Sequence, residues 1–212
     1  MKTGIRGMRM IQKRKAVYKT WMFVFCGGLF FGILLLGGLK ELLVNENGIF
    51  GPAFLRYLQN PEIEQNAFLA YVIRQRMKEY IMLGILSTTF LGISSVYFFI
   101  VWQGMISGMV LATVFVRFGL KGIILLVAGM FPHQLLFIPA TVMMLIWTYQ
   151  NCSIFYYPGK YIGPGYHHKK QIFVRQGFLL VWIFCVVFIG CILECYVNPI
   201  LLTDVAKIFY LS

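Results

Sequence analysis

Long apolar runs alternate with short clusters of charged residues along this chain. Residues 21–39, 80–116 and 122–159 contain no charged side chain, and these runs are 19, 37 and 38 residues long. A helix needs about 20 apolar residues to cross a bilayer, so the first run fits one crossing and each of the others fits about two. The pattern therefore predicts helices that span a membrane.

We expect an all-α polytopic membrane protein with about five transmembrane helices. The uncharged stretch Trp102-Gln103-Gly104 predicts a turn between the second and third spans. Ten apolar residues before Pro132-His133 are too few to cross, so the fourth span is kinked or carries a re-entrant piece around Gly122–Pro139. The expected order is a basic cytoplasmic segment at 1–20, a span at 21–39, an extracytoplasmic loop at 40–79, spans at 80–101, 104–120 and 122–149, a basic cytoplasmic loop at 150–175, a span at 176–197 and an extracytoplasmic tail at 198–212.

The polar region at 40–79 ends in a predicted amphipathic helix. Asn60-Pro61-Glu62 is typical of a helix start, and no breaker follows until Gly84, so the helix leads directly into the second span. Its apolar residues gather along one broad side, which we interpret as a partner-binding surface. That surface is formed by Ile63, Phe68, Tyr71 and Val72. The alternative is that the same side lies on the bilayer or on the other spans.

Composition and charge agree with a membrane protein. The chain is 59% hydrophobic and 12% charged, against roughly 25% charge in soluble chains. Its net charge of +12 fits membrane topology better than nucleic-acid binding, because Lys and Arg accumulate in cytoplasmic segments. The expected inner segments hold 7 + 4 = 11 basic residues and no acid, whereas the expected outer ones hold the other 8 basic and all 7 acidic residues. The amino end is therefore predicted to be cytoplasmic.

Two ionisable residues lie in the predicted membrane region. Glu194 is the only acid within a predicted span and is a functional candidate for that reason. It lies 18 residues past Gln176, roughly 27 Å along a helix, so it is expected near the outer boundary. A structural contact and a functional role are equally favoured. His133 is interpreted as a helix-capping or interfacial residue rather than a proton relay. Cysteine spacing and motifs indicate no enzyme, no cofactor and no metal site.

Small residues recur at four-residue spacing in the predicted spans. Such seams let helix backbones approach closely in lipid. We favour internal packing over a dimer face, although a homo-oligomer stays open. The residues concerned are Gly28 and Gly32, Thr88 and Gly92, and Gly104, Gly108 and Ala112.

Two short motifs resemble those of the stage II sporulation protein M family. Residues 132–140 read Pro-His-Gln-Leu-Leu-Phe-Ile-Pro-Ala, which is similar to the family's Pro-His-Gly, two apolar residues, Glu, an apolar residue and Pro-Ala. Residues 193–199 read Leu-Glu-Cys-Tyr-Val-Asn-Pro, which resembles its closing acid, aromatic residue and Pro. Gln134 replaces the usual Gly, and Phe137 stands where the family usually has Glu. The matching residues are Pro132, His133, Pro139, Ala140, Glu194, Tyr196 and Pro199.

The resemblance implies a non-enzymatic scaffold in the plasma membrane of endospore-forming bacteria. Such a scaffold tethers the peptidoglycan-degrading stage II sporulation proteins D and P at the septum during engulfment. Its other expected partner is membrane lipid, and nucleic acid is not expected. One alternative is a small transporter or permease subunit that uses His133 and Glu194 in a broken-helix site. Another is a membrane-embedded assembly factor of an unrelated pathway.

Overall fold

The computed structural model describes residues 2–38, 65–156 and 169–198 as a set of long α-helices. Four of them contain segments long and apolar enough to cross a membrane, within Val17–Gly38, Gly92–Val116, Gln134–Tyr156 and Val174–Tyr196. The fold class predicted from the hydrophobic pattern is therefore confirmed. The helices are α1 (Lys2–Gly38), α4 (Gln65–Ser87), α5 (Gly92–Met130), α6 (Gln134–Tyr156) and α8 (Lys169–Tyr196).

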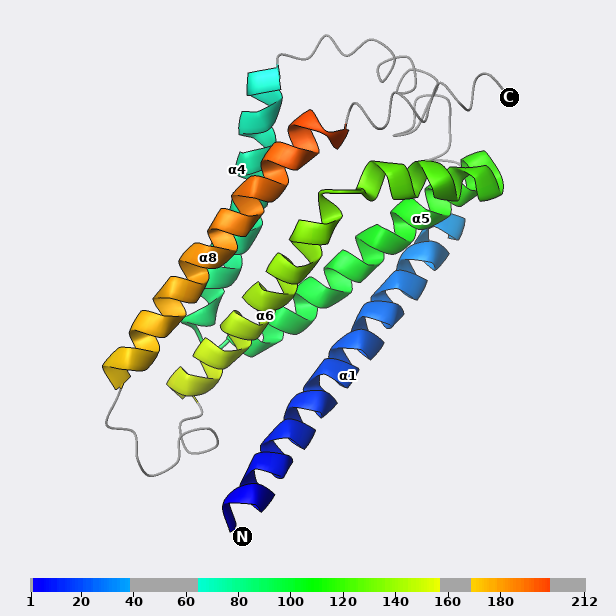
Figure 1. The fold of residues 1–212 in the computed structure, drawn as a ribbon. Helices are drawn as coiled ribbons and strands as arrows, with labels where there is room; N and C mark the ends of the chain where they lie inside the picture. Colours follow the sequence, from blue (N-terminus) through cyan, green and yellow to red (C-terminus); the bar gives the residue numbers. More distant parts are fainter. Residues whose placement is uncertain (1, 39–64, 157–168, 199–212) are drawn as a thin grey trace.

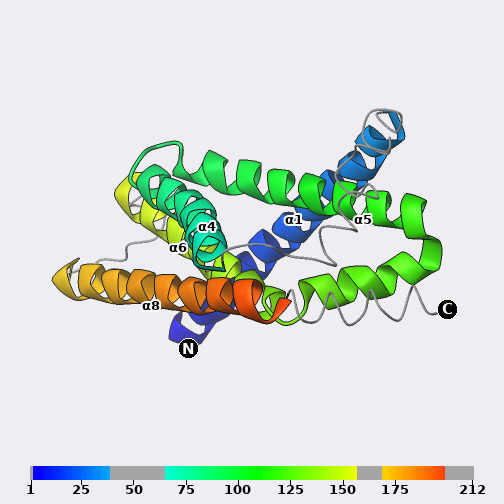
Figure 2. The same cartoon turned by 90° about the horizontal axis from the view of Figure 1, so that it is seen from above.

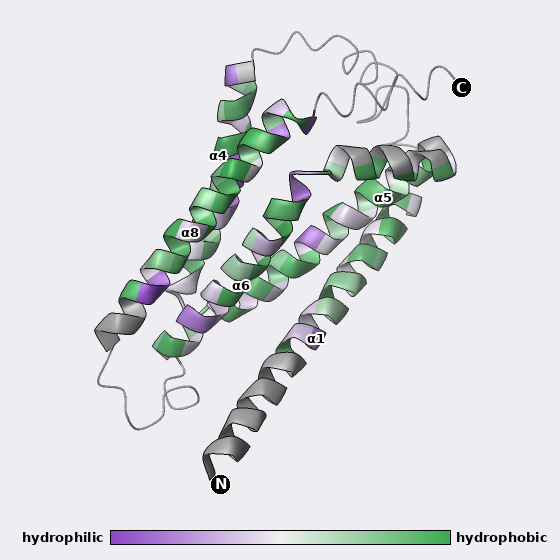
Figure 3. Ribbon diagram, viewed as in Figure 1, coloured by the Kyte–Doolittle hydropathy of each residue, from purple (hydrophilic) through white to green (hydrophobic). Residues whose placement is uncertain are grey.

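The helices form one bundle in which successive helices run in opposite directions. The start of α1, the α4–α5 turn and the end of α6 lie at the same end of the bundle (Figure 1). Viewed from above, α4 lies between α5, α6 and α8, and it packs against all three (Figure 2). Hydrophobic residues predominate along the coloured parts of the helices (Figure 3). Large apolar side chains are exposed on every described helix, as a lipid-facing surface requires.

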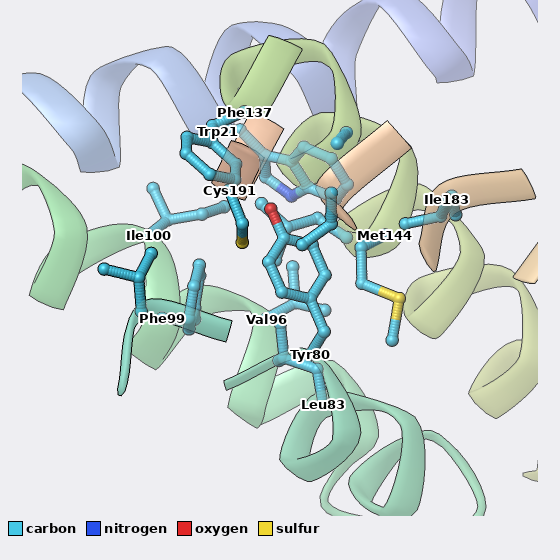
Figure 4. Close-up of a cluster of buried hydrophobic side chains, with 14 of the residues drawn as sticks. Trp21, Tyr80, Leu83, Val96, Phe99, Ile100, Phe137, Met144, Ile183 and Cys191 are labelled. Carbon is cyan, nitrogen blue, oxygen red and sulfur yellow. The ribbon is translucent and has the colours of Figure 1, made fainter. Parts of the chain in front are cut away.

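Side chains from all five helices meet in the centre of the bundle (Figure 4). Trp21 of α1 is 8% exposed, and four residues of the other helices have exposures of 2% or less. Those four residues are Leu83 of α4, Val96 of α5, Met144 of α6 and Ile183 of α8. This core holds α4 inside the bundle, although α4 carries four charged residues, which are Arg74, Arg76, Lys78 and Glu79.

Helix α1 packs along α5 through glycines on both helices. A β-carbon on Gly28 or Gly32 would collide with the backbone carbonyl of Val101 or Met105, and one on Gly104 or Gly108 would collide with backbone atoms of α1. Because glycine has no side chain, the two backbones approach closely enough for extensive van der Waals contact. The interpretation of these glycines as an internal packing seam is confirmed.

The turn expected at 102–104 lies instead at 88–91, between α4 and α5. Trp102-Gln103-Gly104 is part of the continuous helix α5, and Gly104 contacts α1. The hydroxyls of Thr88 and Thr89 donate to the carbonyls of Ile85 and Leu86 at 2.7 and 2.9 Å. These bonds satisfy carbonyls that a continued helix would have used, so α4 ends at Ser87. The expected spans at 80–101 and 104–120 are therefore wrong in their bounds.

The broken element predicted around Gly122–Pro139 is present. Gly119 has φ +58° and ψ −145°, a conformation that favours glycine, and α5 bends there before its last turns. The chain leaves helical geometry at 131–133, and α6 begins at Gln134. The apolar piece 122–130 therefore belongs to the second arm of α5, not to a single fourth span running over 122–149.

The residues of the expected partner-binding surface do not share one exposed side of α4. Val72 is 6% exposed and belongs to the core, and Phe68 packs against it. Tyr71, by contrast, is 66% exposed. Ile63 and the expected helix start at Asn60 lie outside the described residues. The side that carries Phe68 and Val72 is thus covered by the other helices, which was the alternative interpretation.

Candidate functional site

An ion pair joins α4 to α8 at the end of the bundle expected to face outward. Nη2 of Arg76 lies 3.2 Å from Oε1 and 3.3 Å from Oε2 of Glu194, and its Nε lies 3.4 Å from Oε2. The two side chains are 26% and 19% exposed. The sequence identified Glu194 but not its partner, because the hydropathy pattern places Arg76 in the loop before the second span.

The Pro-His motif lies against this ion pair. Cζ of Arg76 stands 4.6 Å from the centre of the Phe137 ring, close enough for a cation–π contact. The His133 ring meets Phe137 edge-on, with 5.9 Å between their centres. A β-carbon on Gly190 of α8 would come within 2.9 Å of the Phe137 ring, so this glycine lets α6 and α8 close around it.

His133 lies in the short segment before α6 and is 4% exposed. Its Nδ1 has no hydrogen-bond partner among the described residues. Burial lowers the pKa of His133; the carboxylate of Glu194 opposes this shift and the guanidinium of Arg76 adds to it. The imidazole is therefore neutral at physiological pH. This position suits packing against the ion pair better than it suits a proton relay.

The other motif residues lie apart from the ion pair or serve packing. Ala140 is 2% exposed and belongs to the core, and Pro139 stands within α6. Tyr196 is 40% exposed near the end of α8. Pro199 lies outside the described residues. Of the residues that carry the resemblance, the structure brings His133 and Glu194 together, and it adds Arg76 and Phe137 to them.

Glu79 is a second acid within the bundle, which sequence reasoning missed. It stands eight residues before the end of α4 at Ser87, about 12 Å along the helix axis. The candidate membrane spans lie on α1, α5, α6 and α8, and α4, which carries Glu79, packs against the last three of these helices. The sequence analysis assigns Glu79 to the outer loop, because it expects the second span to begin at residue 80. An ionisable residue on a helix that packs against membrane-spanning helices is a functional candidate.

A cavity of about 610 Å³ opens between α1, α4, α5 and α6 beside Glu79. Its walls are mostly apolar, and Tyr80 and Thr141 share a 2.7 Å hydrogen bond between their hydroxyls. Trp21, Phe25 and Phe99 close it on the α1 and α5 sides. Its volume lies within the range of about 300–1,000 Å³ that is usual for small-molecule sites.

The groups described above take part in helix packing and line a cavity. No three His, Cys, Asp or Glu side chains lie close enough to hold a metal ion in the part of the chain that the structure describes. Cys191 and Cys195, on the same helix as Glu194, are buried free thiols. The Arg76–Glu194 ion pair and the contact of Arg76 with Phe137 hold α4, α6 and α8 together.

Comparisons with known proteins identify one family. The family model described as stage II sporulation protein M matches residues 21–199, a range that includes both motifs, the Arg76–Glu194 pair and every residue lining the cavity except Tyr18. No curated protein and no solved structure matches the chain. The chain belongs to the stage II sporulation protein M family, and it is a sporulation-related membrane protein.

Proposed function

We propose that this protein is a non-enzymatic scaffold that tethers peptidoglycan-degrading partners at the septal membrane during engulfment. The partners expected by resemblance are stage II sporulation proteins D and P. The family is not a known enzyme family, which is consistent with this role. The supporting observation is that Arg76 and Glu194 bind each other and so fasten α4 to α8. A transporter that uses Glu194 for its substrate needs that carboxylate free, so the scaffold is the better proposal.

A tether for wall-degrading proteins needs a surface beyond the outer membrane boundary. Glu194 is expected near that boundary, and Arg76 is its ion-pair partner. Tyr71 precedes Arg76 by five residues, so it lies about 7.5 Å farther from the α4–α5 turn along the axis of α4. Tyr71 and Arg74 are exposed on the side of α4 opposite its packed residues. We therefore place the partner contact on this exposed side of α4, in place of the side that carries Phe68 and Val72. Exposed aromatic residues are frequent anchors of protein interfaces.

The test is co-purification from sporulating cells. Tagged wild-type protein should recover proteins D and P from solubilised membranes, and Tyr71→Ala should lose most of this recovery at normal membrane level. Met82→Ala is the matched control, because Met82 is 48% exposed on the same helix but lies 11 residues further toward the α4–α5 turn. Failure of the wild type to recover either protein would refute the tether. If Tyr71→Ala recovers as much of proteins D and P as the wild type does, the proposed contact on the exposed side of α4 is wrong.

A further inference from the structure

Glu79 is an acidic residue that lines two cavities. Its side chain lines the 610 Å³ cavity and also a second one of about 280 Å³ between α4 and α5. Within the described chain, no side chain forms an ion pair or hydrogen bond with the Glu79 carboxylate. The guanidinium of Arg76 on the same helix attracts it, but that guanidinium is hydrogen-bonded to Glu194. A carboxylate inside a membrane protein needs a proton, a cation or a hydrogen-bond donor.

The charges around the large cavity leave an excess of one negative charge. Among the described lining residues, Arg76 and Glu79 are the two that carry charge, and the charge of Arg76 is already balanced by Glu194. Neutral polar groups on the remaining wall come from Gln103, Ser107, Gln134 and Thr141. An anionic head group would therefore meet repulsion from Glu79 and no free cation on this described wall. A cationic nitrogen would meet a carboxylate that can bind it.

The apolar part of the cavity extends from Glu79 toward α1. Trp21, Met22 and Phe25 line that side, and Val142 and Leu145 line the α6 side. Figure 4 shows Trp21, Phe137 and Tyr80 near one another in this region. The Glu79 carboxylate on one wall and the apolar volume beyond it are complementary to an amphiphile, which has a polar head group and an apolar chain.

We propose that this cavity binds a hydrophobic amine, with its ammonium group at the Glu79 carboxylate and its apolar chain against Trp21 and Phe25. Two sources share this chemistry, namely a free alkylamine-like molecule and the head group of an amine-bearing membrane lipid such as phosphatidylethanolamine. The site is independent of the tethering role, because it lies inside the bundle and away from Tyr71. It needs no chemical step.

The binding assay uses Trp21 as a reporter in the full-length protein. Phenylalanine replaces Trp102, Trp147 and Trp182, so that Trp21 is the remaining tryptophan. The protein is placed in phosphatidylcholine nanodiscs and titrated with a bromine-terminated dodecylamine, whose bromine quenches tryptophan on contact. The alcohol and carboxylic acid of the same chain serve as matched probes. A second set of nanodiscs contains phosphatidylethanolamine.

The amine should quench Trp21 saturably and bind at least about tenfold more tightly than the alcohol or the acid. Glu79→Gln should remove this preference while Glu79→Asp retains it, and Val142→Phe should weaken all three probes by filling the cavity. Weaker amine binding in phosphatidylethanolamine discs would identify the lipid as the source, and unchanged binding would identify a free amine. Equal binding of amine and alcohol to the wild type would overturn the proposal, whether or not any variant folds. An unchanged amine preference in Glu79→Gln would overturn it as well.

Discussion

Replacing Arg76 by Met tests whether the ion pair holds α4 to α8. Methionine keeps the length and much of the volume of the side chain but removes its charge. The variant leaves the Glu194 carboxylate without its paired cation, in a site where that carboxylate is 19% exposed. It also removes the cation–π contact with Phe137. The bundle should become less stable without losing its helices.

The magnitude follows from the distance and the exposure of the pair. Two unit charges 3.2 Å apart attract each other by about 5 kcal/mol at an effective dielectric constant of 20, before desolvation is subtracted. Breaking a fully buried pair costs about 3–5 kcal/mol, and breaking an exposed one costs about 0–1 kcal/mol. Because both side chains are partly exposed, we expect Arg76→Met to lower the free energy of unfolding by about 2–3 kcal/mol. Glu194→Gln should lower it by about 1 kcal/mol, because Gln keeps an acceptor.

The assay is equilibrium unfolding in mixed detergent micelles, with helix content as the signal. Arg74→Met is the matched control, because Arg74 is an exposed basic residue on the same helix. A third measurement uses Arg76→Met combined with Glu194→Leu, which removes both charges. This double variant should be less destabilised than the sum of its two single variants by about 1 kcal/mol or more. Equal losses in Arg76→Met and Arg74→Met, or strict additivity in the double variant, would refute the reasoning.

Three further outcomes can be measured in the same preparations. Gly108→Val should lower the free energy of unfolding by about 1–3 kcal/mol, because the new side chain meets the backbone of α1. Phe137→Glu, made in the Glu194→Gln background, should be about 1 kcal/mol more stable than Phe137→Gln in that background, because only Glu gives the arginine of the ion pair a new carboxylate. In a variant without native cysteines, a cysteine at Leu120 should react with an impermeant thiol reagent in intact cells, and one at Phe90 should not.

Each of these outcomes has its own control. Gly27→Val should change stability little, because a β-carbon added at Gly27 would meet no atom within 4 Å; a loss as large as that of Gly108→Val would argue against close packing as the cause. Phe137→Gln in the same background separates the effect of charge from that of ring loss, and equal behaviour of Gln and Glu would contradict the new ion pair. The reverse labelling pattern at the two cysteines would invert the proposed orientation.

The helical fold could be read from the sequence because composition dominates in a membrane. Lipid leaves backbone polar groups no partner except those within the helix, so long apolar runs have few alternatives. The small residues on α1 and α5 were also visible, because glycines at four-residue spacing mark one helix face. Their pairing with each other was not visible, since spacing identifies a face but not the helix that covers it.

The position of the first turn in the 37-residue uncharged run could not be fixed by hydropathy. That run holds several short polar stretches, and the sequence interpretation favours the one around Gln103. A different stretch, Ser87-Thr88-Thr89, ends α4 because its hydroxyls bond to the preceding turn. This clustering of hydroxyl residues was the available signal. Because the turn is predicted at the wrong stretch, most of α4 is assigned to the outer loop, and Arg76 and Glu79 are assigned there with it.

Phe137, which stands where the family usually has Glu, lies beside Arg76. Where the family usually has an acid, this chain presents an aromatic face to the guanidinium, 4.6 Å from the ring centre. A ring stabilises a cation by about 0.5–2 kcal/mol, which is less than a partly buried carboxylate supplies. Glu194 is therefore the carboxylate on which Arg76 depends here. Substitutions of Glu194 should be more harmful in this chain than in family members that keep an acid at the position of Phe137.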